Sequence, residues 1–242
     1  HANDNPLAQC MSGNFGMEGV MGLDQILEDL EKAKTDENIE GIFLRLTNIP
    51  AGVATVEEIR DGLLDFRESA KFIIAHADQY SQKTYYLATA ADEIYLTPTG
   101  NFSFTGLHSE VTFFKRALDK LGVDMQVIRH GSYKSAVEPF MKEELSKENR
   151  EQLDVMLTTL WGQMVKGISE ERNIPVEDLN RYADEVMLTL DESALEKEMI
   201  DGLKYYDEIL DDLRERTDTE EDDDIPSIAL KKYKNVPKED DS

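Results

Sequence analysis

The stretch Gly41-Ile-Phe-Leu44 is short and apolar, and Phe72-Ile-Ile-Ala75 repeats the same pattern further along the chain. Between them, Thr55-x-x-Glu58 has the form of a capping box that opens a helix. The inward face of that helix is expected to consist of Ile59, Leu63 and Phe66. A strand, a helix and a second strand in this order favour parallel pairing through a crossover helix. Residues 41–75 therefore predict an α/β fold.

The alternation of helices and strands continues on both sides of this stretch. Helices are expected from Leu23, whose apolar partners are Ile26, Leu27 and Leu30, from Tyr85, and over 113–121. Further strands are expected at 93–96, ended by Pro98, and at 125–128. Because no Gly-x-Gly-x-x-Gly turn follows a strand, a nucleotide-binding Rossmann unit is disfavoured.

The strongest helical pattern runs from Lys147 to about Arg172. Its apolar stripe is expected to lie in the core or at a subunit interface and consists of Leu153, Met156, Leu157, Leu160, Trp161, Met164, Val165 and Ile168. Pro175 ends the pattern, and shorter helices are expected at 176–183, 192–197 and 206–216. A last strand is expected at 228–230. The domain organisation is then an irregular arm at 1–22, an α/β domain at 23–216 and an acidic and polar tail at 217–242.

The chain is strongly acidic, with a formal net charge of −25 over 242 residues, and is long enough to bury a core. Such a charge disfavours nucleic acid and anionic lipid as partners, since both are polyanions. No apolar run approaches the roughly 18 residues that span a bilayer. The sequence shows no secretory signal and does not begin with methionine, so we expect a piece of a longer protein.

Residues that could hold a metal or cofactor are few, and none is expected to be bound. Cys10 is the single cysteine, so it forms neither an internal disulfide nor a thiolate metal site. The histidines are scattered without ligand spacing and are expected to be surface or structural: His1, His76, His108 and His130. No Walker loop, His-Glu-x-x-His, calcium loop or Gly-x-Ser-x-Gly elbow occurs. The run Asp222-Asp-Asp224 is interpreted as solvated tail.

One lysine carries the chemistry that the sequence suggests. Lys134 follows the apolar run 125–128 and Gly131, a setting that would hold its ammonium in a fixed place. It could bind an anion, or act as a general base if burial or a nearby cation lowers its pKa. Because Ser132 and Ser135 flank it, a Ser–Lys hydrolase is one hypothesis, and an ordinary exposed lysine is the other.

The segment Gly131-x-Tyr-Lys-Ser-Ala-x-Glu-Pro-Phe140 resembles the lysine segment of long bacterial members of peptidase family S49, the signal peptide peptidases. Three further stretches agree in order: Tyr80-Ser-Gln-x-x-Tyr-Tyr-Leu-Ala88, Ala91-Asp-Glu-Ile94 leading to Pro98-x-Gly100, and Leu118-Asp-Lys-Leu-Gly122. The resemblance covers roughly residues 23–203. It implies the Clp protease/crotonase-like fold, a superhelix of β-β-α units, here with additional C-terminal helices. It also implies ring-like homo-oligomers at the bacterial cell membrane, with the soluble domain outside the cytoplasm and a membrane anchor that this chain lacks.

The resemblance further implies a division of catalytic labour between two homologous halves. Lys134 matches the general base, while the nucleophilic serine belongs to a Ser-Gly-Gly turn in a C-terminal half that is not in this chain. Ser81 lies where such a turn would fall, but no glycine follows it, and the loop Asn48–Gly52 has one glycine where two are expected. The implied function is the N-terminal half of a serine endopeptidase that degrades signal peptides, inactive by itself. The alternative is a non-catalytic assembly domain with a structural Lys134.

Overall fold

A four-stranded parallel sheet with the order β1-β2-β3-β4 forms the centre of the molecule. The computed structural model describes residues 21–126, 136–186, 191–220 and 223–237. The strands are β1 (Gly41–Leu46), β2 (Phe72–Ser81), β3 (Glu93–Ser103) and β4 (Gly202–Leu203). The α/β class with parallel pairing that the sequence predicts is confirmed, and both strands of the opening stretch pair directly, Gly41 opposite Phe72.

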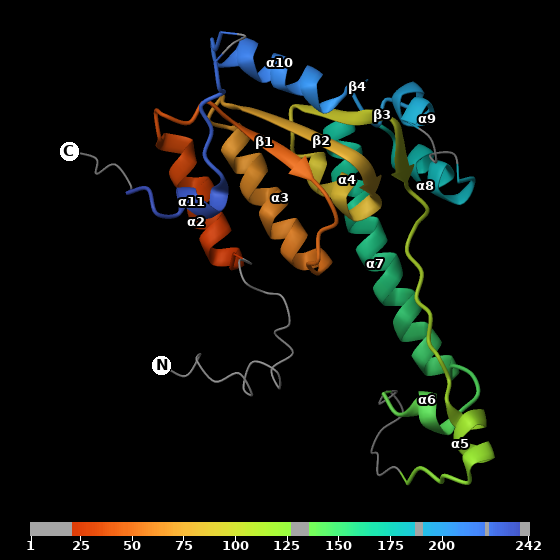
Figure 1. Ribbon diagram of the computed structural model, residues 1–242. Coiled ribbons are helices and arrows are strands. Elements are labelled where there is room, and N and C mark those ends of the chain that lie inside the picture. The colour runs from red at the N-terminus through yellow and green to blue at the C-terminus, as the bar shows by residue number, and fades with distance from the viewer. Residues whose placement is uncertain (1–20, 127–135, 187–190, 221–222, 238–242) are drawn as a thin grey trace, which may run out of the picture.

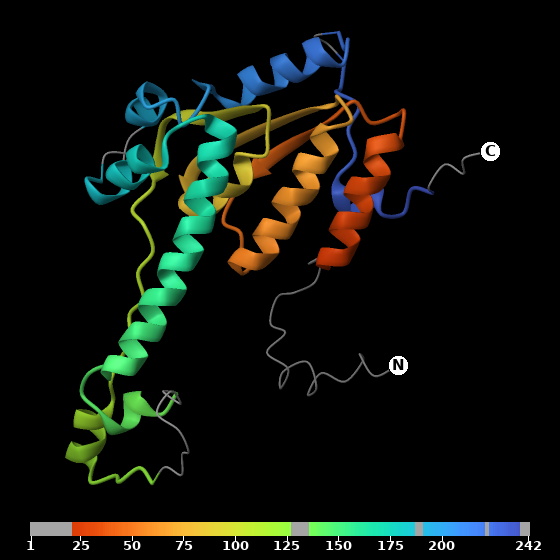
Figure 2. The ribbon, with the colours of Figure 1, turned by 180° about the vertical axis from the view of Figure 1, so that it is seen from behind.

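Helices cover both faces of this sheet (Figures 1 and 2). One face packs against α2 (Leu23–Thr35), α3 (Val53–Arg67), α4 (Gln82–Ala88) and the C-terminal part of α7 (Lys147–Arg172). The other face carries α10 (Tyr206–Arg216). The alternation of side chains along a strand explains the two layers, because Ile73 and Ala75 join the larger core whereas Ile74 packs with Ile209 and Leu213 of α10.

From the end of β3 the chain leaves this body and runs beside α7 to a distal group of helices (Figure 1). These are α5 (Lys115–Leu121) and α6 (Glu138–Met141), after which α7 leads back to the body. We call the described residues 105–126 and 136–160 the arm. Many exposed large apolar side chains lie on it: Phe114, Leu121, Val123, Met125, Phe140, Met141, Val155 and Met156.

The apolar stripe predicted along α7 is divided between two environments. Its C-terminal members Met164, Val165 and Ile168 are buried in the core, which confirms the prediction for that part. Towards the N-terminus of the helix, Met156 is 47% exposed because α7 has there left the body and runs along the arm. The stripe is therefore core at one end and open surface at the other.

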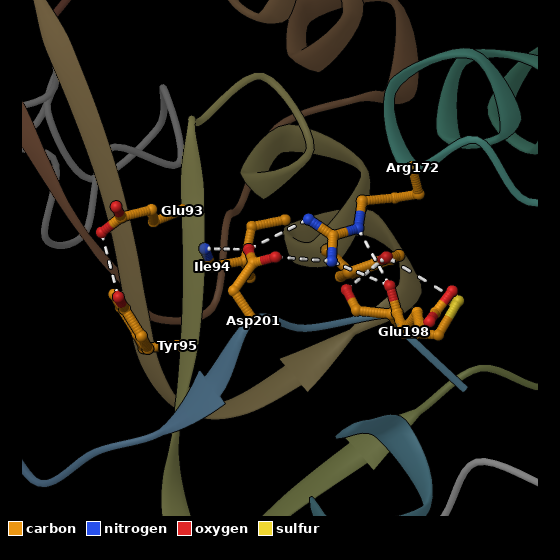
Figure 3. Close-up of polar contacts among 8 residues, drawn as sticks. Glu93, Ile94, Tyr95, Arg172, Glu198 and Asp201 are labelled. Atoms are coloured by element: carbon orange, nitrogen blue, oxygen red, sulfur yellow. Dashed lines mark hydrogen bonds and ion pairs between the residues drawn. The ribbon is translucent and has the colours of Figure 1, made fainter. Parts of the chain in front are cut away.

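Arg172, the last residue of α7, ties this helix to the sheet (Figure 3). Its guanidinium donates to both carboxylate oxygens of Asp201, at 3.0 and 2.9 Å, and to the backbone carbonyl of Glu198, at 3.1 and 2.8 Å. Asp201 in turn accepts a hydrogen bond from the backbone N–H of Ile94 in β3, at 2.8 Å. This chain of contacts fixes the inner end of the helix that carries the arm.

The remaining described helices complete the body. They are α8 (Val176–Asp184), α9 (Asp191–Glu196) and α11 (Leu230–Tyr233), and the first two agree with the predicted positions. The strand expected at 228–230 is wrong, because α11 begins at Leu230. Part of the segment 217–242, predicted as an acidic and polar tail, packs against α2: Tyr233 is buried in the core, and Lys32 donates to the carbonyls of Tyr233 and Val236 at 2.8 and 3.1 Å.

Two other local predictions are wrong for identifiable reasons, and a third is tested only in part. The Thr55–Glu58 capping box does not form, because α3 already begins at Val53 with Gly52 as its N-cap. Pro98 does not end β3: the pairing jumps from Ala77–Leu96 to Gln79–Asn101, so Pro98 lies in a bulge without ladder partners, where its missing N–H costs nothing. Residues 125 and 126 are not in a strand, and the rest of the strand expected at 125–128 lies outside the described residues.

Candidate active site

The residues that the sequence associates with catalysis fall in two places, the carboxyl edge of the sheet and the distal arm. The first place holds Ser81, at the end of β2, and the loop Asn48–Gly52, which follows β1. The carboxyl ends of parallel strands are where α/β proteins commonly place their ligand-binding loops. The edge is therefore the natural position for a nucleophile, and the contacts of its side chains decide whether it has one.

Ser81 is exposed, but its hydroxyl is engaged by the helix that it precedes. It is the N-cap of α4, and its Oγ accepts a hydrogen bond from the backbone N–H of Thr84 at 3.2 Å. Thr84 Oγ1 lies 3.0 Å from Ser81 Oγ and accepts from the Ser81 N–H at 2.8 Å, which completes a capping box. Among the described residues, Ser81 has no hydrogen bond to a lysine or histidine that could remove its proton. This arrangement is that of a helix cap.

The two residues after Ser81 bind neighbouring loops instead of presenting open backbone. Lys83 Nζ donates to the carbonyl of Ala51 at 2.9 Å, and Gln82 Nε2 donates to the carbonyl of Gly106 at 2.7 Å. Gln82 Oε1 also accepts from the N–H of Thr105 at 3.2 Å. An oxyanion hole needs converging N–H donors. Here the Asn48–Gly52 loop turns a carbonyl acceptor inward, and a lysine binds it.

The second place, the Lys134 segment, is only partly described. Lys134, Ser132 and Ser135 lie outside the described residues, as do Cys10, His1 and His130. The described structure resumes at Ala136 and includes α6, which begins at Glu138.

Glu138, which the sequence analysis did not single out, is the notable side chain there because it is buried, with 2% of its surface exposed. Its carboxylate accepts hydrogen bonds from Lys142 Nζ at 3.0 Å, the Ser146 N–H at 3.1 Å and Asn149 Nδ2 at 3.1 Å. Burial by itself raises the pKa of this carboxyl, but the hydrogen bonds from Ser146, Lys142 and Asn149 outweigh it and lower the pKa to about 2. The i,i+4 spacing of Glu138 and Lys142 was the available sequence signal.

The described histidines are structural or exposed, as predicted. His76 is buried in β2, where its Nε2 lies 3.1 Å from the carbonyl of Lys204 and 3.2 Å from Thr97 Oγ1. Desolvation by burial lowers the pKa of His76 and so favours its neutral form. His108 is exposed. Within the described part of the chain, no group of three or more His, Cys, Asp or Glu residues is arranged to hold a metal ion.

The described structure is an α/β domain with a parallel sheet, and Ser81, Gln82 and Lys83 at its carboxyl edge make structural contacts. The comparison with protein families identifies it further: residues 65–220 match the model of peptidase family S49. The chain belongs to peptidase family S49, and relatives to which it is similar include proteins named serine protease SPPA and Protease 4.

Three relatives illustrate the extent of the similarity. The chloroplastic serine protease SPPA of Arabidopsis thaliana is 32% identical over 218 residues, which is 90% of this chain and 32% of the relative. Protease 4 of Haemophilus influenzae is 40% identical over 146 residues, 60% of this chain and 24% of the relative. Protease 4 of Salmonella typhi is 37% identical over 158 residues, 65% of this chain and 26% of the relative. The chain thus spans only a quarter to a third of the length of these proteases.

None of the described helices is long and apolar enough to cross a membrane. The longest of them, α7, carries charged residues in both of its end segments, 147–154 and 166–172.

Proposed function

We propose that this chain is the lysine-bearing half of a serine endopeptidase of the Ser–Lys type. In this proposal, Lys134 is the general base that removes the proton of a serine hydroxyl, and a second half of the protein contributes that serine. The observation that carries the proposal is that side chains at the carboxyl edge of the sheet are already engaged in structural hydrogen bonds. Ser81 is a helix cap there, and Lys83 and Gln82 are bound to the carbonyls of Ala51 and Gly106. In this proposal, the Ser81 position of this edge therefore does not supply the nucleophile.

The chemistry sets one requirement on Lys134. An amine accepts a proton only when it is neutral, and an ordinary lysine with a pKa of about 10.4 is almost fully protonated at neutral pH. A lysine base must therefore be partly desolvated or lie beside another cation. In this proposal, contact between the two halves desolvates the Lys134 amine, because it removes water from the residues at their junction.

The arm is the part of the chain that we propose to make this junction. Its apolar residues Phe114 and Phe140 stack with ring centroids 5.8 Å apart and remain 46% and 39% exposed. Exposed apolar surface of this kind marks an interaction site. The proposed occupants are the serine-bearing half and further copies of the protein.

Further parts of the proposal rest on the sequence resemblance. They are the Clp protease/crotonase-like superhelix as the complete fold, signal peptides as substrates, and a location at the bacterial cell membrane with the domain outside the cytoplasm. A non-catalytic assembly domain remains the second candidate, and the occupied edge of the sheet favours it for any form of the protein that lacks the serine half.

Three variants of Lys134 test the proposed base. Lys134→Arg keeps a positive charge but stays protonated at any working pH, whereas Lys134→Met and Lys134→Ala remove the amine. In a preparation that hydrolyses a fluorogenic peptide, all three are expected to abolish turnover without changing the unfolding midpoint. For the wild type, rate against pH should rise with a midpoint well below the ordinary lysine pKa. Near-normal activity of Lys134→Arg would refute the mechanism and favour the assembly domain.

The isolated chain gives a complementary test. It is expected to show no peptide hydrolysis, because Ser81, the serine at the position where the nucleophile would fall, is a helix cap. Turnover by the isolated wild type that disappears in Ser81→Ala would show that the nucleophile is misplaced in this proposal.

A further inference from the structure

The long edge of the sheet belongs to β1. The strand at the other edge, β4, has two residues, whereas β1 has six residues and pairs with β2 on one side. No strand in the described part of the chain pairs with its second side. Proteins usually protect such an edge with short strands, prolines, bulges or outward charges. β1 has neither a proline nor a register shift, and its one charged side chain, Arg45, lies over the ring of Tyr206.

The side chains of β1 are less covered than those of the strand beside it. Ile73 and Ile74 of β2 are completely buried, whereas their register partners Ile42 and Phe43 in β1 are only half-buried. The difference appears on both faces of the sheet, because Ile42 packs against the larger core and Phe43 against the α10 side. Parallel sheets are normally covered throughout. A further strand beside β1 would cover both of these side chains at once.

A groove of about 730 Å3 lies at the start of this edge. One wall is α10, through Tyr206 and Leu210, and the other is residues 225–236, which we call the strap and which passes β1 to reach α2 (Figure 1). The strap is held at its two ends, where Ile225 packs with the α10 cluster and Tyr233 is buried. Within the described residues, no backbone hydrogen bond joins the strap to β1. The strap therefore borders the edge without closing it.

The lining of the groove indicates the chemistry of what fits there. It is largely apolar and uncovered, since Ile228 of the strap is 42% exposed and Tyr206 is 39% exposed. The charged residues that line it are both acidic, Asp36 and Glu40, and no described lysine or arginine lines it. Asp36 already accepts a hydrogen bond from the Tyr233 hydroxyl at 2.8 Å, while Glu40 is exposed just before β1. A complementary ligand carries apolar side chains and a positive charge beside Glu40.

The shape of the site favours a single extended chain over a second folded copy. The start of the edge lies between two walls, α10 and the strap. The β1 edge of another copy would be flanked by the same walls, and these would hold the two edges apart. An extended peptide is narrow, and its own N–H and C=O groups pair with a free strand edge.

We propose that the free edge of β1 is a strand-binding site. Its occupant is an extended polypeptide segment, apolar at alternate positions and basic at the end beside Glu40. This segment pairs with β1 as a fifth strand and places its apolar side chains against Tyr206, Leu210 and Ile228. No step of this inference involves Lys134, so it stands or falls separately from the proposed catalytic function.

The probe is a fluorescein-labelled peptide, Lys-Val-Thr-Val-Thr-Val-Lys, whose terminal lysines place a charge beside Glu40 in either strand direction. Fluorescence anisotropy with the 242-residue chain should show saturable binding. Successive N–H groups of a strand point to opposite sides, so the peptide is also made with either alternate set of backbone nitrogens methylated. One set should weaken binding about ten-fold or more, because it removes the pairing donors, and the other set should weaken it much less.

Matched variants of the protein locate the site. Ile228→Ser removes apolar surface from the groove and should weaken binding about five- to ten-fold. Val176→Ser changes a residue of similar exposure, 38%, on α8 and should leave the Kd unchanged. Glu40→Gln should weaken binding about two- to five-fold at low salt, because it removes a charge at the rim. Glu37→Gln, exposed in the same loop but outside the groove lining, should have a smaller effect.

Three results would overturn the proposal. Without saturable binding, or with equal effects of the two methylated sets, the peptide does not pair as a strand. An unchanged affinity in Ile228→Ser would place the peptide outside the groove. Dimers seen by light scattering that Ile228→Ser dissociates and Val176→Ser does not would make a second copy the occupant.

Discussion

Replacing Arg172 by alanine tests whether a single guanidinium fixes the inner end of α7. The substitution removes the paired hydrogen bonds to Asp201 and both bonds to the carbonyl of Glu198. Only 11% of the Arg172 side chain is exposed, whereas 35% of Asp201 is exposed. Breaking a fully buried ion pair costs about 3–5 kcal/mol. Because water can reach the orphaned Asp201, we expect the lower value of about 2–3 kcal/mol.

Urea unfolding of the isolated chain measures this loss. The midpoint should fall while the slope of free energy against urea stays constant, because the substitution does not change the surface that unfolding exposes. For a chain of this size, 1 kcal/mol corresponds to about 2–4 °C in Tm, so Tm should fall by about 4–12 °C. The matched control is Arg181→Ala, which removes an i,i+3 pair with Asp178 in which Arg181 is 52% exposed. It should cost less than about 1 kcal/mol.

The two variants together can refute the reasoning. If Arg172→Ala and Arg181→Ala lose the same free energy of unfolding, burial and bidentate geometry do not distinguish the two arginines. The fixed inner end of α7 would then have to come from its apolar contacts alone, Met164, Val165 and Ile168.

Three other predictions concern acid stability, packing and association. The folded state lowers the pKa of Glu138 from 4.5 to about 2, so the stabilisation that this carboxylate gives is complete above pH 4.5 and is lost as the pH falls towards 2. The unfolding free energies of the wild type and of Glu138→Gln should therefore converge over this pH window. A difference that stays constant with pH would contradict the prediction. A Cβ at Gly167 would lie 2.9 Å from the Tyr86 ring, so Gly167→Ala should destabilise by about 1–3 kcal/mol in urea, despite the better helix propensity of alanine. The chain should self-associate in light scattering, and Met156→Glu should lower the apparent mass; a monomeric wild type would refute this.

Much of the body could be predicted from the sequence because its patterns are local. The apolar runs at 41–44 and 72–75 became β1 and β2, and the helical spacing from Lys147 to Arg172 gave α7 with the predicted bounds. These runs bury apolar surface whichever partner they meet, so periodicity suffices to place them.

The errors arise where a distant contact decides the local structure. Pro98 normally ends a strand, but the bulge opposite Asp78 in β2 leaves it unpaired and lets β3 continue to Ser103. Residues 228–230 are apolar and were expected to form a strand, yet α11 begins at Leu230, and Lys32 of α2 binds the carbonyls of Tyr233 and Val236. Neither partner can be identified from the neighbouring sequence.

The same limit applied to the candidate site. Ser81 could be doubted from sequence because no glycine follows it, but the reason it is a cap, the reciprocal bonds with Thr84, required the structure. For Glu138, the sequence offered the i,i+4 spacing to Lys142 but gave no sign of burial. Its burial depends on Ser146 and Asn149, whose approach is a property of the arm.

The arm and the body are stabilised by different forces, and this difference bears on function. The body has an apolar core on each face of the sheet, whereas the arm is organised around the charged Glu138 and leaves apolar residues such as Phe114 and Met156 exposed. The hydrogen bonds of Glu138 fix how the helices of the arm pack without burying its apolar side chains. That apolar surface therefore stays available to another polypeptide, and the arm can be folded before such a partner binds.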